Sequence, residues 1–290
     1  MARARALKIY HMMVNSRQKL KINFIYKSKN KEEILVLEPK QKPATIIFPH
    51  GLGTDAKSRQ ELVIQNELHT KFPSVKFIFP QAPTRRVNID AGSTAPDFGK
   101  GAEMPSWFDI QWKWDEIKDP LELEEFERLA KFDDEELKQS IKKINKIIQQ
   151  EIKEGTPANR IIIMGFSQGG ALTAAMALTS KYKLGGFVIL SGWLPNREQM
   201  FKKAEKNNHL NQETPVLFCH GGQDEWVPYW LGKKHCEFFE KKNYNVEFVS
   251  HISFNHEIKP EQIHKVTQFL ECVLNPQIQQ SNVGFPTKIA

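Results

Sequence analysis

From residue 34 onward, short apolar runs alternate with longer segments in which apolar residues recur at helical spacing. The short runs are rich in β-branched or aromatic residues and are mostly bounded by Pro or Gly, a pattern typical of β-strands. They cover residues 34–37, 45–49, 75–80, 160–165, 187–190, 216–219 and 246–251. Because residues 161–164 are apolar throughout, we expect this strand to be parallel to its neighbours and covered on both faces.

The longer segments predict helices. Residues 168–181, 229–242 and 260–274 fit this pattern, and so do residues 133–154, with Asp133 or Asp134 as the cap. One face of the segment 133–154 carries Leu137, Ile141, Ile144, Ile148 and Ile152. Alternating strands and helices predict the α/β class, with a mostly parallel sheet and helices on both faces.

Three segments stand apart from this alternation. Residues 82–116 form a long stretch rich in Gly, Pro, Asp and aromatics, which predicts a functional loop. Residues 275–290 are polar and predict a loosely held tail. Residues 1–31 are basic and contain no acid, so they are either a solvated extension, an extra strand pair, or an Arg-containing organelle-targeting segment. We therefore expect one domain over residues 32–274.

The charge distribution argues against a nucleic-acid partner. The net charge is +7, but nine of the 41 Lys and Arg residues lie in 1–31, which leaves 32 against 34 Asp and Glu, a net of −2. The apolar runs are too short to cross a bilayer, so no stable membrane insertion is expected. Cys219, Cys236 and Cys272 form no CxxC or Cys/His ligand cluster, which predicts no metal site and a reducing compartment. The cytoplasm is the expected location, or the mitochondrion if residues 1–31 are a targeting segment.

The segment 160–171 carries the clearest chemical signal. A strand pattern leads into Gly165-Phe-Ser167-Gln-Gly169, and a helix rich in small residues follows. A serine on such a strand-to-helix turn has its hydroxyl raised above the sheet, and the flanking glycines let neighbouring backbone pass closely. This pattern predicts that Ser167 is a nucleophile and that the N–H of Gln168 meets a developing oxyanion.

A serine nucleophile needs a base and an orienting acid, which follow it along the chain in this fold. Asp224 comes just after the strand at 216–219, with Glu225 as its rival, and predicts the acid. His256 precedes the last helix and predicts the base. The other histidines are expected to be structural or exposed, with a strand position for His251, a helix position for His264, a turn position for His220 and a packing role for His50.

A second oxyanion donor is expected after an early strand. Residues 45–49 run into His50-Gly51-Leu52-Gly53, and the N–H of Leu52 is the candidate.

Taken jointly, these motifs resemble the acyl-protein thioesterase and lysophospholipase group of carboxylesterases, which are small cytosolic α/β-hydrolases. The resemblance rests on segments 49–53, 80–83, 104–110, 165–171, 190–195 and 220–228 together with His256, in the order found in that family. It implies hydrolysis of thioesters on S-palmitoylated proteins, of lysophospholipids or of small esters, with Ser167, Asp224 and His256 as the triad and Leu52 and Gln168 as oxyanion donors. The chain departs from the family at Thr54, at residues 222–223 and in a longer stretch 86–103.

Such chemistry needs no metal or organic cofactor. Trp107, Phe108 and Trp193 are candidates to line an apolar acyl groove, with plain core aromatics as the alternative. The expected partner is an acylated protein or lipid substrate, and a weak homodimer is compatible with the sequence. A rival hypothesis is a hydrolase-fold subunit with a structural or interaction role in a larger assembly.

Overall fold

The computed structural model describes residues 22–27, 32–37, 44–90, 98–112, 116 and 122–275. Its centre is an eight-stranded sheet in the order β1-β2-β4-β3-β9-β10-β11-β12. β2 is antiparallel to both β1 and β4, and the other pairs are parallel. The bounds of these strands are β1 Ile22–Lys27, β2 Glu32–Leu37, β3 Ala44–Ile47, β4 Val75–Pro80, β9 Ile161–Phe166, β10 Gly186–Leu190, β11 Val216–Gly221 and β12 Val246–His251.

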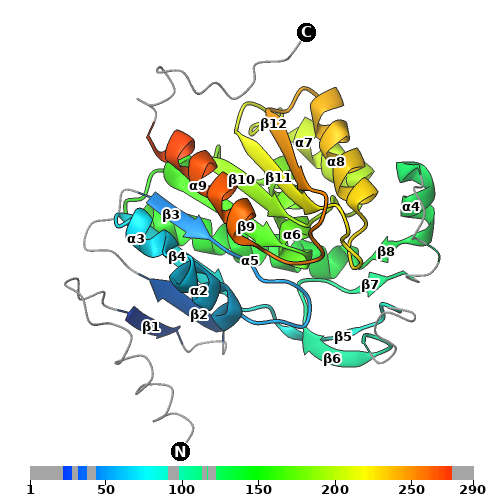
Figure 1. Ribbon diagram of the computed structural model, residues 1–290, viewed down its shortest axis with the longest axis horizontal. Helices are drawn as coiled ribbons and strands as arrows, with labels where there is room; N and C mark the ends of the chain where they lie inside the picture. Colours follow the sequence, from blue (N-terminus) through cyan, green and yellow to red (C-terminus); the bar gives the residue numbers. More distant parts are fainter. Residues whose placement is uncertain are drawn as a thin grey trace, which may run out of the picture.

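Helices cover both faces of the sheet (Figure 1). One face carries α2 (Ala56–Gln65), α3 (Leu68–Lys71) and α9 (Pro260–Leu274). The other carries α5 (Asp134–Lys153), α6 (Gln168–Thr179), α7 (Arg197–Lys206) and α8 (Tyr229–Lys241), with α4 (Leu123–Leu129) packed at the edge of this layer. The predicted α/β architecture is confirmed.

The two layers explain why the central strands are apolar at every position. In β9, Ile161 and Ile163 join the core under α5 and α6, whereas Ile162 and Met164 join the core under α2 and α9. Successive side chains of a strand point to opposite faces, so a strand buried on both sides needs an unbroken apolar run.

The element predictions were correct for most of the central sheet, and those for β4, β12 and α9 match the observed bounds. The prediction of a loop over 82–116 was wrong at the ten residues that form short strands. β5 (Thr84–Val87) pairs with β6 (Ala102–Pro105), and β7 (Ile110–Gln111) pairs with β8 (Lys131–Phe132). These strands are too short to show a period of two in the sequence. The pattern also missed α2, α3, α4, α7 and the short 3₁₀ turn Ala158–Arg160.

At the N-terminal end, β1 lies in the segment 1–31 and pairs with β2, which agrees with the expectation of an extra strand pair and not with that of a wholly solvated extension. The rest of residues 1–31, and the predicted tail beyond residue 275, lie outside the described residues. Within the described ranges, no helix combines the length and the hydropathy that crossing a membrane requires.

Candidate active site

Ser167 occupies a sharp turn between β9, which ends at Phe166, and α6, which begins at Gln168. Its backbone angles are φ 55° and ψ −122°, a region that residues with a Cβ rarely occupy. Strain of this kind persists only where the surrounding structure enforces it, and it is the conformation expected for a nucleophilic serine between a strand and a helix.

The two glycines that flank the serine are required by close backbone contacts. A Cβ on Gly165 would lie 2.0 Å from the carbonyl oxygen of Gly169, and one on Gly169 would lie 2.2 Å from the carbonyl oxygen of Pro49. Both distances are far below contact distance. The motif therefore allows the turn to form and lets the loop after β3 reach Ser167.

Asp224 lies just beyond the end of β11, as predicted. Its Oδ1 accepts hydrogen bonds from the N–H groups of Trp226 and Val227 at 2.9 and 2.7 Å. Its Oδ2 lies 2.8 Å from Nδ1 of His256, and its carboxylate is 0% exposed. Burial by itself raises the pKa of Asp224, but the hydrogen bond and charge of His256 outweigh it, and the net pKa is lowered. The side chain is therefore a buried carboxylate aimed at His256.

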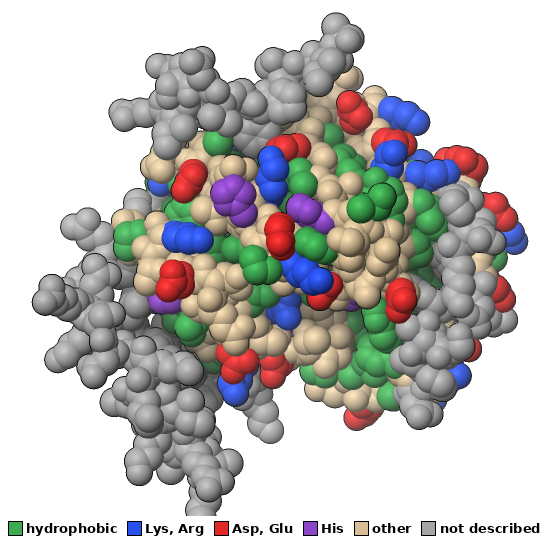
Figure 2. Space-filling view, viewed as in Figure 1, with side chains coloured by type: hydrophobic (Ala, Val, Ile, Leu, Met, Phe, Trp, Pro, Cys, Tyr) green, Lys and Arg blue, Asp and Glu red, His purple; other side chains and the backbone are tan. Residues whose placement is uncertain are grey.

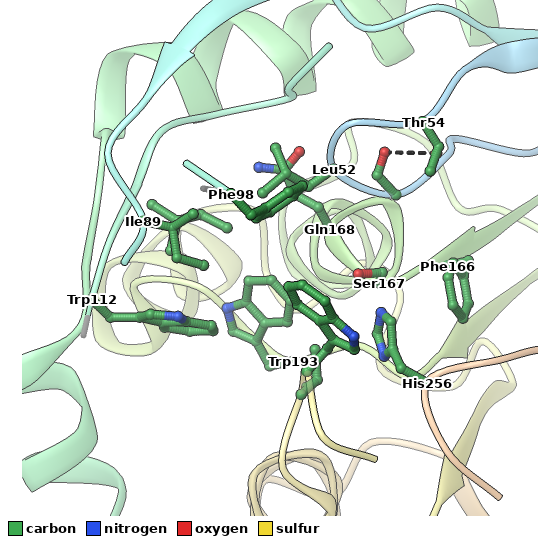
Figure 3. A pocket seen from close by; sticks show the side chains of 14 residues that line it. Leu52, Thr54, Ile89, Phe98, Trp112, Phe166, Ser167, Gln168, Trp193 and His256 are labelled. Atoms are coloured by element: carbon green, nitrogen blue, oxygen red, sulfur yellow. Dashed lines mark hydrogen bonds between the residues drawn. The ribbon is translucent and has the colours of Figure 1, made fainter. Parts of the chain in front are cut away.

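His256 lies on the loop between β12 and α9, and both its side chain and Ser167 line the same pocket (Figure 3). Its ring packs 4.8 Å from the ring of Phe166, the residue before the serine. Because Nδ1 donates to Asp224, the neutral ring carries its free lone pair on Nε2, the atom a general base uses. The structure thus brings the three predicted residues to one end of the sheet.

The other four histidines considered above, His50, His220, His251 and His264, are not among the residues that line the pocket. His251 ends β12, and His264 is exposed on α9. The prediction of a turn position for His220 was wrong, since this residue belongs to β11 and is fully buried, with Nε2 3.4 Å from Oδ2 of Asp224. The two glycines after it, which suggested a turn, mark the close approach of residues 252–255 instead.

The loop carrying Leu52 is held in place by His50. Nδ1 of His50 donates to the carbonyl of Gly51 at 2.8 Å, and Nε2 accepts from the N–H of Ala82 at 3.0 Å. Burial lowers the pKa of His50 to about 4, so the ring is neutral and its tautomer is fixed by these two partners. The N–H of Gly53 donates to the carbonyl of Pro105, which anchors the far side of the loop.

The two predicted oxyanion donors both lie at the pocket, because Leu52 and Gln168 are among its lining residues. Gln168 is the first residue of α6, where an N–H has no acceptor within the helix. The helix dipole adds partial positive charge at the same point. The arrangement can therefore stabilise negative charge that develops beside Ser167.

Trp107 and Phe108, predicted to line an acyl groove, lie instead in the core, and both are 0% exposed. The N–H of Trp107 donates to Oε1 of Gln168, its indole N–H donates to the carbonyl of His50, and the carbonyl of Phe108 accepts from Nε2 of Gln168. Both residues therefore support Gln168 from within the core, so the groove prediction was wrong for them and the alternative of plain core aromatics was correct. The segment they belong to was identified correctly, but its hydrogen bonds turn these two side chains inward.

The pocket itself is apolar and has a volume of about 180 Å³. Of the predicted groove residues, it is lined by Trp193. Sequence reasoning missed Ile89, Phe98, Ile110, Trp112 and Trp226. Phe98 meets Trp226 edge to face at 5.3 Å, which joins the stretch before β6 to the loop after Asp224. Two features of the sequence could have identified several of these residues, namely the many aromatic residues in 82–116 and the position of Trp226 two residues after Asp224.

Other chemistries find less support in the described residues. No cluster of three or more His, Cys, Asp or Glu there could hold a metal ion. Burial raises the pKa of Cys219 and of Cys236 to about 12, so both thiols stay protonated and are poor nucleophiles.

The sheet order, the strained serine and the Asp224–His256 pair define a serine hydrolase of the α/β-hydrolase fold. The sequence profile of the Phospholipase/Carboxylesterase family matches residues 30–274, and the chain belongs to this family. It is an enzyme that hydrolyses carboxylic esters or thioesters.

Individual relatives agree with this assignment. Over 237 residues the chain is 34% identical to acyl-protein thioesterase 1 of Gibberella zeae, which covers 82% of this chain and 93% of the relative. It is 33% identical to acyl-protein thioesterase 1 of Saccharomyces cerevisiae, covering 78% of this chain and 91% of that one. Among solved structures it is similar to acyl-protein thioesterase 2 of Zea mays, with a TM-score of 0.65, 27% identity, and coverage of 84% and 99% of the two chains. Similarity to SOBER1 of Arabidopsis thaliana is comparable, with a TM-score of 0.66, 27% identity, and coverage of 80% and 99%.

Proposed function

We propose that this enzyme releases acyl groups from protein thioesters through a covalent intermediate on Ser167. The observation that carries the proposal is the shared pocket of Ser167 and His256 together with the 2.8 Å contact between His256 and Asp224. A serine hydroxyl is a weak nucleophile until a neighbouring base takes its proton, and a buried carboxylate keeps that base in the productive tautomer.

The reaction has two acyl transfers. Oγ of Ser167 attacks the carbonyl carbon while Nε2 of His256 takes the hydroxyl proton, giving a tetrahedral oxyanion. The bond to sulfur or oxygen then breaks, His256 gives its proton to the leaving group, and the acyl group stays on Ser167. Water repeats the sequence with His256 again as base, which releases the carboxylic acid and restores the serine.

The oxyanion is stabilised in this scheme by the N–H groups of Leu52 and Gln168. Losing one such donor costs on the order of 3 kcal/mol in the transition state of a well-studied serine protease. The strained turn at Ser167 positions the N-terminus of α6, which carries Gln168, and the neutral His50 holds the loop that carries Leu52, so the oxyanion hole is formed before substrate arrives.

The acyl group occupies the apolar pocket next to Ser167. Its side chains include Trp112, Trp193, Phe98 and Trp226, so each methylene that enters gains about 0.8 kcal/mol. A volume of about 180 Å³ lies below the ~300 Å³ at which typical ligand pockets begin. The pocket therefore encloses a short acyl group, or the first part of a long one.

The curated relatives named acyl-protein thioesterase favour an S-acylated protein as substrate, with lysophospholipids and small esters as further candidates. We propose a cytoplasmic location, with the mitochondrion as the alternative if residues 1–31 act as a targeting segment. No nucleic-acid partner and no stable membrane insertion are proposed. On the face seen in Figure 2, basic and acidic side chains of the described residues are interspersed, as the net charge of −2 beyond residue 31 suggests. A weak homodimer stays a prediction, and so does a single domain over 32–274.

A structural or interaction role in a larger assembly remains the second hypothesis, motivated by the basic N-terminal segment, the long stretch 86–103 and the polar C-terminal segment 275–290. The strain at Ser167 speaks against it. Its backbone angles, φ 55° and ψ −122°, lie outside the left-handed helical region that Glu67 and Asn196 occupy, and a protein without a serine reaction gains nothing from this strain.

The experiment compares acyl thioesters with matched oxygen esters of two to sixteen carbons, using the purified enzyme and its Ser167→Ala variant. We expect turnover of both classes by the wild-type chain, a preference for thioesters, and no turnover above background by the variant. Equal turnover by the variant would contradict the proposal. No turnover by either protein would favour the assembly role.

A further inference from the structure

Asp224 has two histidines at one carboxylate oxygen. Its Oδ2 lies 2.8 Å from Nδ1 of His256 and 3.4 Å from Nε2 of His220. The mechanism above uses the first of these rings and leaves the second without a role. His220 lies near the end of β11, four residues before the acid, so the strand that leads to Asp224 also supplies a side chain against it.

His220 is a neutral hydrogen-bond donor. It is 1% exposed, and burial lowers its pKa despite the opposing charge of Asp224. Its Nε2 lies 2.8 Å from the carbonyl oxygen of Val227, which can only accept, so Nε2 carries the proton. That N–H donates mainly to Val227 and points its positive end toward Oδ2 of Asp224 as well.

The hydrogen bond to Val227 closes a clamp around the acid. The N–H of Val227 donates to Oδ1 of Asp224 at 2.7 Å, while the carbonyl of the same residue accepts from His220. Val227 therefore joins the two groups, since its N–H holds the carboxylate of Asp224 and its carbonyl holds the buried ring of His220 on β11. If the ring were lost, the turn and the carboxylate it holds could rotate together.

His220 is too enclosed to serve as a base. A Cβ on Gly232 of α8 would lie 2.3 Å from its Nδ1, so the helix backbone covers that side of the ring. Tyr229 packs edge to face against it with a centroid distance of 6.3 Å. Neither ring nitrogen has access to the pocket that holds Ser167, and His220 is not among the residues that line it.

We propose that His220 is a positioning residue that fixes the Asp224 carboxylate against His256 through the carbonyl of Val227. This inference rests on the proposed function, because it assigns His220 a part in the same acyl transfer. The positive charge on His256 exists only while the proton is in transit, so an error in the direction of Asp224 raises the barrier without changing how the acyl chain binds. The expected signature is therefore in kcat rather than in KM.

The test compares three variants. His220→Gln keeps an N–H at the position of Nε2, since the same number of bonds separates both atoms from Cβ. His220→Leu keeps apolar bulk and removes the donor. Gly232→Ala leaves His220 in the sequence but drives a methyl group into its ring. Lys233→Ala, an exposed change on the same helix, is the matched control.

For His220→Leu and Gly232→Ala we expect kcat on a short thioester, and the rate of inactivation by a fluorophosphonate, to fall at least tenfold. KM should change less than twofold, and His220→Gln should recover most of the loss. The downfield proton resonance of the His256–Asp224 hydrogen bond should shift or broaden in His220→Leu and Gly232→Ala. It should keep its wild-type position in His220→Gln. This resonance reports the positioning of Asp224 whether or not the enzyme turns over.

Equal losses in His220→Gln and His220→Leu would overturn the inference, and so would a loss that appears in KM or an unchanged proton resonance. If His220→Leu does not fold, Gly232→Ala is compared with Lys233→Ala instead. The inference then requires a lower kcat, an unchanged KM and a shifted proton resonance in Gly232→Ala alone. Failure of the proposed function would be recognised by a different result, because the wild-type enzyme itself would then not be inactivated by the fluorophosphonate.

Discussion

The ring of Phe166 lies 4.8 Å from the imidazole of His256, centroid to centroid, at an interplanar angle of 39°. Phe166 is the last residue of β9 and directly precedes Ser167, so the strand that delivers the serine also supports the histidine. On Phe166 also lies the guanidinium of Arg59, 5.1 Å from the ring centroid. The relative position of serine and histidine is thus set partly by one aromatic side chain.

Replacing Phe166 with Leu removes the ring while keeping an apolar side chain of similar length. An aromatic pair contributes about 0.5–1.5 kcal/mol beyond buried area, so we expect kcat to fall roughly two- to tenfold. Steady-state kinetics on a short ester measure it. Phe254→Leu, on the same loop but stacked on His251, is the control and should leave kcat unchanged. A loss of equal size in both variants would show that loop stability, not the contact with His256, is responsible.

Gly169→Ala tests the steric reading of the turn. The added Cβ would lie 2.2 Å from the carbonyl oxygen of Pro49, so the turn or the loop after β3 must move. A displacement near 1 Å at a reaction centre can cost on the order of a hundredfold, and we expect kcat/KM to drop by at least that factor.

Gly155→Ala provides a comparison for backbone strain without crowding. Gly155 has φ +98° and nothing within 4 Å of an added Cβ. Its substitution should lower the free energy of unfolding by about 1–2 kcal/mol and leave kcat/KM unchanged. Normal activity of Gly169→Ala would contradict the account of the turn.

Phe98→Ala tests the assignment of the pocket to the acyl chain. Loss of the ring removes contact worth about one or two buried methylenes, about 0.8–1.6 kcal/mol. The ratio of kcat/KM for an octanoyl ester to that for an acetyl ester should therefore fall roughly four- to fifteenfold. Ile252→Ala, an apolar residue 85% exposed and outside the pocket lining, should keep the wild-type ratio. An unchanged ratio in Phe98→Ala would place the acyl chain elsewhere.

Acid stability should depend on His235, which packs against Phe126. Burial lowers the pKa of His235 from 6.5 to about 3. Below pH 6.5 the unfolded chain therefore binds a proton at this histidine, whereas the folded chain does not bind it until the pH approaches 3. The free energy of unfolding is thus highest above pH 6.5 and decreases as the pH falls toward 3. Between pH 7 and pH 5 the neutral, buried His235 should lower the free energy of unfolding by about 2 kcal/mol.

Urea unfolding at the two pH values measures this loss. His235→Met should lose about 2 kcal/mol less than the wild type between pH 7 and pH 5. His50, whose pKa burial lowers to about 4, acts in the same direction and should leave part of the acid sensitivity in place. Identical pH dependence of wild type and variant would show that His235 is not buried in its neutral form.

The sequence was most informative where a local pattern determines the structure. The apolar run of β9 and the glycines around Ser167 are each required by contacts within a few residues or with one neighbouring strand. The fold class and the convergence of Ser167, Asp224 and His256 could therefore be predicted. The acid and the base were placed at the carboxyl end of the sheet by their order along the chain together with their positions directly after predicted strands.

Features that depend on distant contacts could not be predicted. α2 was missed because charged and polar residues dominate it, although Ala56, Gln60 and Val63 face the core. Trp107 was expected in the pocket, but its hydrogen bonds to Gln168 and His50 turn it inward. A turn position was predicted for His220 because two glycines follow it. Its burial depends instead on α8, which comes later in the chain.

The central claim is that Ser167 attacks the acyl carbonyl, and the most direct test is to trap the adduct. The enzyme is incubated with a fluorophosphonate, digested and mapped by mass spectrometry, beside the Ser167→Ala variant. The account predicts one adduct, on the peptide that contains Ser167, and none on the variant. An adduct on another residue of the wild type, or equal labelling of Ser167→Ala, would contradict it.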